Sequence, residues 1–226
     1  DGLWPKDRHK TRKTEIIFPH LALFCGGANI ANLQEKSVRW VMLDEAWTYK
    51  AGRIQMARRR THDGWNARVC VLSQGGYQGG DLHAAWEQTD QAEYRYTCPG
   101  CGAVRPWRFS ELKWDECRTE NGKRDWAALA ASVRLECECG HITPDKPEHR
   151  RKLSNSGVYV ATNANAIPRH RGYTLNSMAV WWSSWFDLVS EFLKCCDEKE
   201  RANLEPLKLW TMQRMAEFWR DEQIEN

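Results

Sequence analysis

The sequence predicts an α/β protein with a parallel sheet, a cysteine-rich insertion in its middle and a helical C-terminal part. Three observations support this. In the first third, two apolar runs of strand length flank a helix-like segment, the pattern of parallel strands joined by a helical crossover. Two closely spaced cysteine pairs lie in the middle of the chain. In the last third, apolar residues recur at helical spacing.

The first apolar run, residues 38–46, ends in two adjacent carboxylates, Asp44 and Glu45. A near-continuous apolar run is typical of a strand buried on both faces. The acids then lie at the carboxyl edge of the sheet, where open α/β folds bind ligands. One acid can hold Mg²⁺, and the other can orient or deprotonate a water molecule that attacks a phosphate. This is the form of a Walker B motif; the alternative is a strand that ends in a solvated acidic turn.

The second apolar run, residues 67–72, follows a helix-like segment from Gly52 to His62 and ends in Ser73-Gln74-Gly75-Gly76. A polar side chain at the tip of a neighbouring parallel strand can sense a γ-phosphate or position a water molecule. Gln74 is therefore the candidate for that role. The alternative is a glycine-rich surface turn.

The remaining elements are predicted from periodicity, turn residues and caps. Two helices are expected in the last third, one with an apolar stripe from Trp185 and one with a stripe from Leu207. Further strands are expected at 15–19, 21–24, 134–135 and 158–160, and further helices at 29–34, 81–91 and 125–131.

Nine cysteines are an odd number, and four of them form two close pairs: Cys98 with Cys101, and Cys137 with Cys139. This pattern points to a reducing compartment and a metal rather than to a disulfide framework. Four thiolates from two short turns match a tetrahedral structural zinc site. The second pair is one residue shorter than usual, so His141 could replace Cys139 as the fourth ligand. The alternative is reduced cysteines without a metal.

The bulk composition permits nucleic acid as a partner without requiring it. The 226 residues carry a formal charge of +3, and the mean hydropathy is −0.71, which predicts a soluble protein without membrane contact. Basic clusters at 146–152 and 169–171 are usually solvated surface, with DNA backbone contact as the alternative. The chain starts with Asp1 rather than Met, so a piece of a longer protein is expected.

With these motifs placed, the sequence resembles the large subunit of the DNA-packaging terminase of tailed bacteriophages, in its lambda-like branch. The resemblance runs from about Phe18 to Trp219. Four motifs carry the resemblance, and their order and spacing are specific only when the motifs are taken together. They are Cys25-Gly26-Gly27-Ala28-Asn29, Val38-Arg39 to Asp44-Glu45, Thr89-Asp90-Gln91, and Gly172-Tyr173-Thr174-Leu175-Asn176 followed by Trp185.

The resemblance implies an ATPase motor that threads phage DNA into a procapsid, with a separate nuclease domain. Asp44 would bind Mg-ATP, Glu45 would be the catalytic carboxylate, and Ser73-Gln74 would be the coupling motif. Structural zinc would be held by Cys98, Cys101, Cys137 and Cys139. The implied cofactors of the full-length protein are Mg²⁺ and ATP. The implied partners are double-stranded DNA, the small terminase subunit, the procapsid portal and other copies in a homo-oligomeric ring, in the host bacterial cytoplasm.

Two motifs that the family pattern includes are missing from this sequence, and their absence indicates which parts of the family's domains to expect here. No G-x-x-x-x-G-K-[ST] motif occurs, and no acidic cluster for a two-metal nuclease follows Trp219. We therefore expect a partial P-loop ATPase sheet of the ASCE type, without P-loop or nuclease domain and inactive by itself. Its expected parts are the second half of the motor core at 1–93, a zinc ribbon at 94–145, and a returning strand with helices at 146–226. The alternatives are a zinc-ribbon nucleic-acid-binding module and an assembly domain, both without catalysis.

Overall fold

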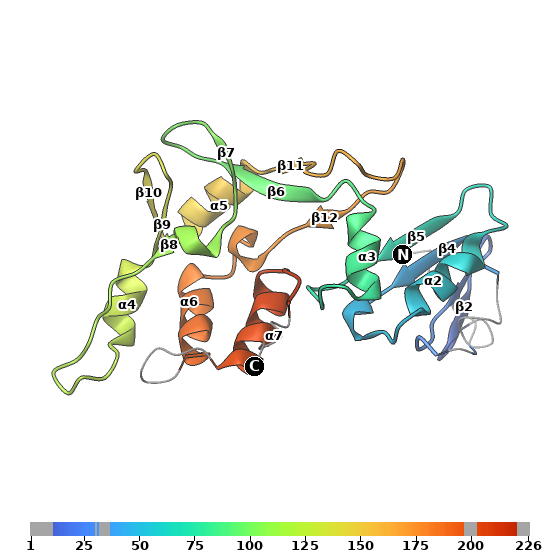
Figure 1. Cartoon of the computed structure of the whole chain (residues 1–226), viewed down its shortest axis with the longest axis horizontal. Helices are drawn as coiled ribbons and strands as arrows, with labels where there is room; N and C mark the ends of the chain where they lie inside the picture. The colour runs from blue at the N-terminus through green and yellow to red at the C-terminus, as the bar shows by residue number, and fades with distance from the viewer. Residues whose placement is uncertain (1–10, 30, 32–36, 197–202, 221–226) are drawn as a thin grey trace, which may run out of the picture. The chain divides into compact units, whose positions relative to one another are not determined.

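The computed structural model describes residues 11–29, 31, 37–196 and 203–220. The chain forms two compact units, Asp1–Leu72 and Ser73–Asn226, whose elements are labelled in Figure 1. Each unit combines helices with strands, so the predicted α/β class is confirmed in its general form. In the part of the chain that the structure describes, no helix is long and apolar enough to span a bilayer.

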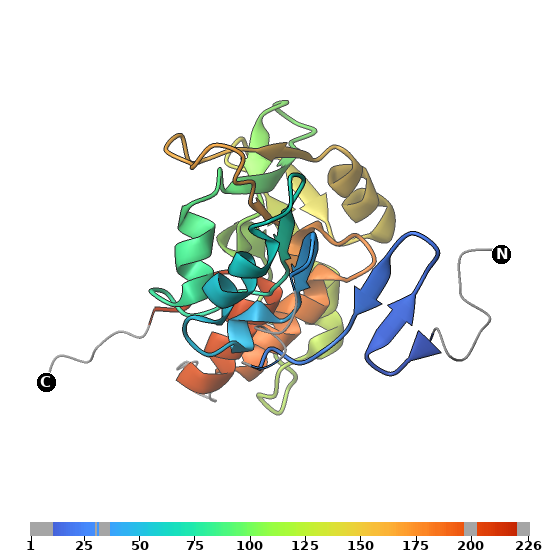
Figure 2. The same ribbon diagram turned by 90° about the vertical axis from the view of Figure 1, so that its right-hand side faces the viewer.

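The first unit begins with a small antiparallel sheet, drawn in dark blue in Figure 2. It consists of β1 (Thr11–Arg12), β2 (Glu15–Ile17) and β3 (Ala22–Phe24), with β2 in the middle. The two strands predicted here are confirmed as β2 and β3, which pair antiparallel with Ile16 opposite Leu23. The helix predicted at 29–34 lies almost entirely outside the described residues.

The rest of the first unit is a β-α-β arrangement, as the alternation of apolar runs predicted. Strand β4 (Trp40–Leu43) pairs parallel with β5 (Arg68–Val71), and Leu43 lies opposite Val71. Helix α2 (Arg53–Arg58) and the 3-10 turn η3 (Arg59–Thr61) connect them. Ile54 and Ala57 of α2 are fully buried. This connection brings the C-terminal ends of two parallel strands together.

One expectation about this sheet is corrected. Strand β4 is not buried on both faces, because side chains alternate along a strand: Leu43 is buried, whereas Trp40 is 65% and Met42 is 72% exposed. The parallel sheet of the first unit consists of two strands in the described residues, so the expected ASCE-type P-loop sheet stays a prediction. Among the described residues, parallel strand pairing is limited to β4 with β5 and a short contact of β6 with β12.

The strands in the described part of the second unit form two small sheets. In the first, β6 (Ala92–Thr97) is the central strand and pairs with β11 (Val158–Val160), β7 (Val104–Pro106) and β12 (Tyr173–Thr174). In the second, β9 (Arg134–Glu136) lies between β8 (Leu112–Lys113) and β10 (Ile142–Pro144). The strands predicted at 134–135 and 158–160 are therefore confirmed as parts of β9 and β11.

The helices of the second unit are α3 (Asp81–Glu87), α4 (Trp126–Ser132), α5 (Pro147–Asn155), α6 (Trp185–Lys194) and α7 (Leu204–Arg214). Helix α4 begins where Asp125 accepts hydrogen bonds from the N–H groups of Ala127 and Ala128, a typical N-cap. The predicted helices at 125–131 and in the last third are confirmed, and the helix predicted at 81–91 ends earlier. Helix α5 was not predicted, because the buried face of this basic segment includes Arg150.

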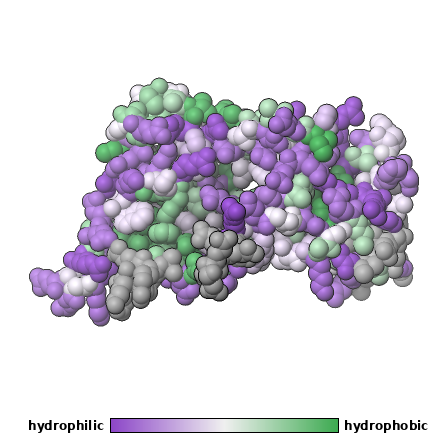
Figure 3. Space-filling view, in the orientation of Figure 1, coloured by the Kyte–Doolittle hydropathy of each residue, from purple (hydrophilic) through white to green (hydrophobic). Residues whose placement is uncertain are grey.

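One hydrophobic core holds the second unit together. It includes Tyr96 of β6, Leu129 of α4, Leu153 of α5, Trp185 of α6 and Trp210 of α7. Aromatic rings meet within it; Phe109 and Trp210, for example, have ring centroids 4.6 Å apart. The face of the molecule in Figure 3 is mostly hydrophilic, with apolar residues in smaller groups. Contacts between segments far apart in the sequence thus build this unit.

Candidate functional site

The two predicted acids lie directly after β4, and an unusual backbone conformation presents them. Glu45 adopts a left-handed conformation with φ 51° and ψ 40°, which costs a non-glycine residue on the order of 1–2 kcal/mol. Asp44 Oδ1 accepts a hydrogen bond from the Glu45 N–H at 3.0 Å. Both residues are exposed. Strained backbone of this kind is concentrated at functional sites.

The turn after Glu45 fixes the second carboxylate. The indole Nε1–H of Trp47 donates to Oε2 of Glu45 at 2.6 Å, and the Thr48 hydroxyl donates to the Glu45 carbonyl at 2.8 Å. These residues form the 3-10 turn η2 (Ala46–Thr48). Trp47 is a further candidate residue of this site that the sequence alone did not indicate; its signal is an indole donor two residues after the acid.

The neighbouring strand β5 holds this turn in place. The Leu72 N–H donates to the Leu43 carbonyl at 2.7 Å, and the Ala46 N–H donates to the Leu72 carbonyl at 3.2 Å. The carboxyl ends of β4 and β5 therefore lie side by side, with two carboxylates after the first strand. Hard cations prefer oxygen ligands of this kind, so the donor set at the end of β4 fits Mg²⁺.

The segment that contains Gln74 follows Leu72 directly in the chain and belongs to the second unit. Gln74 is half-buried, and Gly75 and Gly76 are buried, so the segment is not a loose surface turn. The Gly75 N–H donates to the Met212 carbonyl at 2.8 Å, and the Trp219 N–H donates to the Gly76 carbonyl at 2.7 Å. A Cβ atom on Gly75 would lie 2.0 Å from the Glu217 carbonyl oxygen. The predicted coupling segment is thus tied to the end of α7.

The two cysteine pairs, whose members are 36 to 41 residues apart in the sequence, meet in the structure as one cluster. The sulfur atoms of Cys98, Cys101, Cys137 and Cys139 all lie within 4.8 Å of one another. Sγ of Cys98 and Sγ of Cys139 are 3.7 Å apart, close to the sulfur–sulfur distance of about 3.8 Å in a tetrahedral zinc site with 2.3 Å bonds. The four thiols therefore fit zinc, and the thiol of Cys139 completes the set without His141.

Tight backbone turns build the two halves of this cluster. The Gly102 N–H donates to the Cys98 carbonyl at 2.8 Å, and the Gly140 N–H donates to the Cys137 carbonyl at 2.8 Å. Both glycines have positive φ, 72° and 83°, which glycine adopts without steric cost. A Cβ atom on Gly100 would lie 2.6 Å from Cβ of His141, so the two turns also pack closely against each other.

The surroundings of the cluster favour a thiolate at Cys98. Burial would raise the pKa of this thiol, but the backbone N–H groups of Cys101 and Gly100, together with the neighbouring thiols, lower its pKa to about 7. The thiolate is the form that binds metal. Nearby, the Arg105 guanidinium donates to Glu138 at 2.7 Å and to Glu111 at 2.8 Å. This ion-pair network ties the second cysteine turn to β7.

A buried carboxylate outside both clusters holds the segment before β12. Asp90 accepts a hydrogen bond from the Gly172 N–H at 2.9 Å and one from the Arg171 guanidinium at 2.6 Å. The Gly172 N–H, followed by Arg171, lowers the pKa of Asp90 below its usual range. Its neighbour Gln91 has a positive φ of 49°. Asp90 thus links the start of β6 to residues 171–172.

Comparison with protein families gives two matches. Residues 5–158 match the family described as phage terminase large subunit gpA, ATPase domain. Residues 170–226 match terminase large subunit gpA, endonuclease domain. Comparisons with curated proteins and with solved structures give no match. The first match covers more than half of the 226 residues and contains every candidate site residue predicted from the sequence.

The second match corrects one expectation. The sequence predicted that the nuclease domain is missing from this chain, because no acidic cluster follows Trp219. The endonuclease match instead begins at residue 170, so it includes α6 and α7. Trp219 therefore lies inside the matching region.

Proposed function

Because the chain belongs to the phage terminase large subunit gpA family, we propose that it carries part of the site where ATP hydrolysis drives DNA into a procapsid. The observation that supports this most is the pair of carboxylates, Asp44 and Glu45, at the end of a parallel strand in a β-α-β arrangement. This pair lies inside the region that matches the ATPase domain. The position agrees with the general rule for ligand sites in α/β sheets.

In this proposal each residue has a separate task. Asp44 holds the Mg²⁺ of Mg-ATP, and Glu45 orients or deprotonates the attacking water. When bound, the metal offsets negative charge on the phosphate oxygens. Trp47 positions the Glu45 carboxylate through its indole N–H, at 2.6 Å. Gln74 senses the γ-phosphate and passes the change to the segment that follows it.

We propose a structural rather than catalytic role for the metal at the cysteine cluster. Four thiols close a tetrahedral site, whereas a catalytic zinc keeps one position open for water. Cys98, Cys101, Cys137 and Cys139 would hold the ion, and the close fit of their sulfur atoms supports this. The ribbon at 94–145 would separate a motor part at 1–93 from a part at 146–226.

The proposed partners follow from the family. They are double-stranded DNA, the small terminase subunit and the procapsid portal, with several copies of the protein in a ring in the host bacterial cytoplasm. The P-loop that would cradle the phosphates is expected upstream of these residues, because its motif does not occur in the 226 residues. This chain alone should therefore bind ATP poorly.

The test is DNA-stimulated ATP hydrolysis by the chain extended upstream to include a P-loop. Glu45→Gln keeps the size of the side chain but removes the base, so turnover should fall by about 10²- to 10⁴-fold while ATP affinity is retained. Asp63→Asn is the matched control, because Asp63 is an exposed carboxylate in the same unit and should change neither quantity.

The outcomes separate this proposal from its alternative. Turnover retained in Glu45→Gln would contradict the role of Glu45. Turnover absent from both the parent and the variant, with zinc bound, would favour a zinc-ribbon nucleic-acid-binding or assembly module without catalysis. That alternative depends on the cysteine cluster, which is complete within this chain.

A further inference from the structure

Three tyrosines form a continuous row on one face of the β6 sheet. Tyr94 lies on β6, Tyr159 lies opposite it on β11, and Tyr173 lies on β12. The ring centroids are 5.0 Å apart from Tyr94 to Tyr159, and 5.0 Å apart from Tyr159 to Tyr173. We call these three residues the aromatic row.

The row crosses the sheet above a small side chain. Tyr173 lies opposite Ala92 on β6, and Ala92 shares a face with Tyr94 because side chains two residues apart in a strand point the same way. Ala92 is buried, and the rings of Tyr159 and Tyr173, which lie on the strands to either side of β6, are in contact with each other. Contact between cross-strand rings stabilises a sheet. This stabilisation does not require the solvent-facing sides of the rings to be exposed.

The outer faces are nevertheless open to solvent. Tyr159 is 46% and Tyr173 is 62% exposed, whereas Tyr94 is half-buried and donates its hydroxyl hydrogen to the Ser154 carbonyl at 2.6 Å. Gly157 lets this ring approach, since a Cβ there would lie 2.2 Å from the Tyr94 ring. Tyr94 is thus fixed by its hydrogen bond, whereas Tyr159 and Tyr173 present exposed aromatic surface.

The charge beside the row belongs to an ion pair whose exposed member is the cation. Arg171 is largely exposed and lies two residues before Tyr173. Its partner Asp90 is buried. The acid on the central strand, Glu93, lies on the other face of β6 and is bound by Arg95 at 2.9 Å. A ligand on this face would therefore meet exposed aromatic rings beside a guanidinium group.

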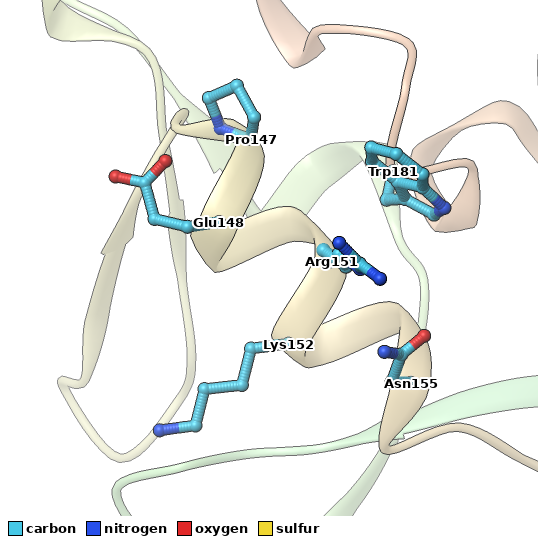
Figure 4. Close-up of a pocket in the computed structure, with 6 residues that line it drawn as sticks. All are labelled: Pro147, Glu148, Arg151, Lys152, Asn155 and Trp181. Atoms are coloured by element: carbon cyan, nitrogen blue, oxygen red, sulfur yellow. The ribbon is translucent and has the colours of Figure 1, made fainter.

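A second arginine–aromatic pair lies about one helical turn from Ser154, whose carbonyl binds the Tyr94 hydroxyl. Arg151 of α5 lies over the ring of Trp181, 5.3 Å from its centroid, and three residues, about one turn, separate it from Ser154. Figure 4 shows Arg151 and Asn155 on the side of α5 that faces Trp181. They line a hollow of about 490 Å³. The neighbouring Trp182 is exposed.

We propose that the aromatic row binds single-stranded DNA, with unpaired bases stacked on Tyr159 and Tyr173 and with Arg171 beside the backbone phosphates. Flat rings in a positive setting bind single strands in this way, since every base has a π-face. The bases of a duplex are already stacked on one another and cannot use such rings. This site goes beyond the proposed function, because it shares no residue with the nucleotide site or the cysteine cluster.

The experiment uses the full chain and a fluorescein-labelled oligothymidine of about 15 nucleotides, within the usual site size. Affinity should fall with rising salt. Tyr159→Ala and Tyr173→Ala should each weaken binding by about fivefold or more. Tyr173→Phe keeps the ring and should bind like the parent. Val158→Ala is the matched control, because Val158 is exposed on the same strand but on the opposite face.

Several results would overturn the proposal. These are a parent that fails to bind the oligothymidine, alanine variants that bind as well as the parent, and a Val158→Ala variant that loses as much affinity as they do. A duplex of the same length that binds as tightly, with the same dependence on the tyrosines, would also contradict it. Equal affinity for an oligouridine, with the same dependence, would support stacking and widen the ligand to any single strand. Unchanged thermal unfolding of the variants shows that a loss is not due to misfolding. Failure of this test leaves the ATPase and zinc tests unaffected.

Discussion

At the scale of single residues, local geometry decides what each polar group can do. Glu45 stands after a strand in a left-handed conformation, and the Trp47 indole holds its carboxylate. The order of strand and acids was visible in the sequence. The indole contact was not, because a hydrogen bond between side chains two residues apart depends on the turn between them, and here the turn is a 3-10 turn rather than a helix.

Asp90 allows a prediction about pH. Its folded-state pKa is lowered, first by the Gly172 N–H and then by Arg171, so its contribution to stability is present above the unfolded-state pKa of about 3.9. That contribution is lost as the pH falls through the folded-state value. Asp90→Asn should therefore destabilise the protein at pH 7 by about 1–2 kcal/mol, and the difference from the parent should become smaller as the pH falls below the unfolded-state pKa.

Urea unfolding followed by tryptophan fluorescence at both pH values measures this difference. Protonation of the cysteine cluster at low pH affects parent and variant alike, so it cancels in the comparison. Asp63→Asn, at an exposed carboxylate, should show no difference at either pH. A gap for Asp90→Asn that is the same at pH 3 and pH 7 would contradict the charged role of Asp90.

At the scale of elements, the cysteine turns carry a prediction about metal. The purified chain should contain about one zinc ion. Cys98→Ser should lose it and make the two cysteine turns within the 94–145 region more accessible to protease, because binding of a structural metal is coupled to folding. Metal analysis and limited proteolysis measure the two effects. Cys25→Ser is the control, since Cys25 is exposed and lies outside the cluster.

The same variants identify the fourth ligand. Cys139→Ser should lose zinc as Cys98→Ser does, whereas His141→Ala should retain it, because the thiol of Cys139 completes the cluster. The sequence left these two residues as alternatives. Zinc retained in both variants, or a parent chain without zinc after purification without chelator, would contradict the structural metal site.

The Gly75 segment carries a second prediction at this scale. Gly75→Ala would place a Cβ atom 2.0 Å from the Glu217 carbonyl oxygen, and backbone cannot move aside as a flexible side chain can. The variant should lose about 1–3 kcal/mol of stability and expose residues 203–220 to protease. Gly27→Ala is the control, because a Cβ there meets no atom within 4 Å. Equal protection of residues 203–220 from protease in both variants would contradict close packing of Gly75 against Glu217.

At the scale of the whole molecule, the boundary between the two family matches falls inside one hydrophobic core. Leu129 and Leu153 lie in the region that matches the ATPase domain, whereas Trp185 and Trp210 lie in the endonuclease match, and all four belong to one cluster. A buried ion pair supports the same junction. Arg150 bonds Asp145 and donates to the Trp181 carbonyl at 3.0 Å, while Asp145 accepts from the Phe186 N–H at 2.8 Å.

A truncation tests this shared core. A chain that ends at residue 162, between the two matches, should lose cooperative unfolding and bind a hydrophobic dye, because it lacks the partners of Leu129 and Leu153. A chain of residues 73–226 should unfold cooperatively, since these residues form one compact unit. Calorimetry with dye fluorescence distinguishes the two. Cooperative unfolding of the 1–162 chain would show that the two matching regions fold independently.

Local patterns predicted most elements of the fold and the composition of the candidate site. Strand β4 with its two acids, the two cysteine turns, and helices α4, α6 and α7 depend on residues close in sequence, where spacing and caps act directly. Helix α5 was missed because the sequence showed a basic cluster, and a buried, ion-paired Arg150 looks the same there as a solvated arginine.

By itself, the sequence determined which segments become strands, helices and cysteine turns, because backbone periodicity and turn chemistry act over a few residues. Only the tertiary structure decided which distant segments meet. It brought Cys139 to Cys98, tied Gly75 to Met212, lined up Tyr94 with Tyr159 and left Met42 exposed. These contacts depend on strand register and on the packing of the whole core, which no local pattern encodes.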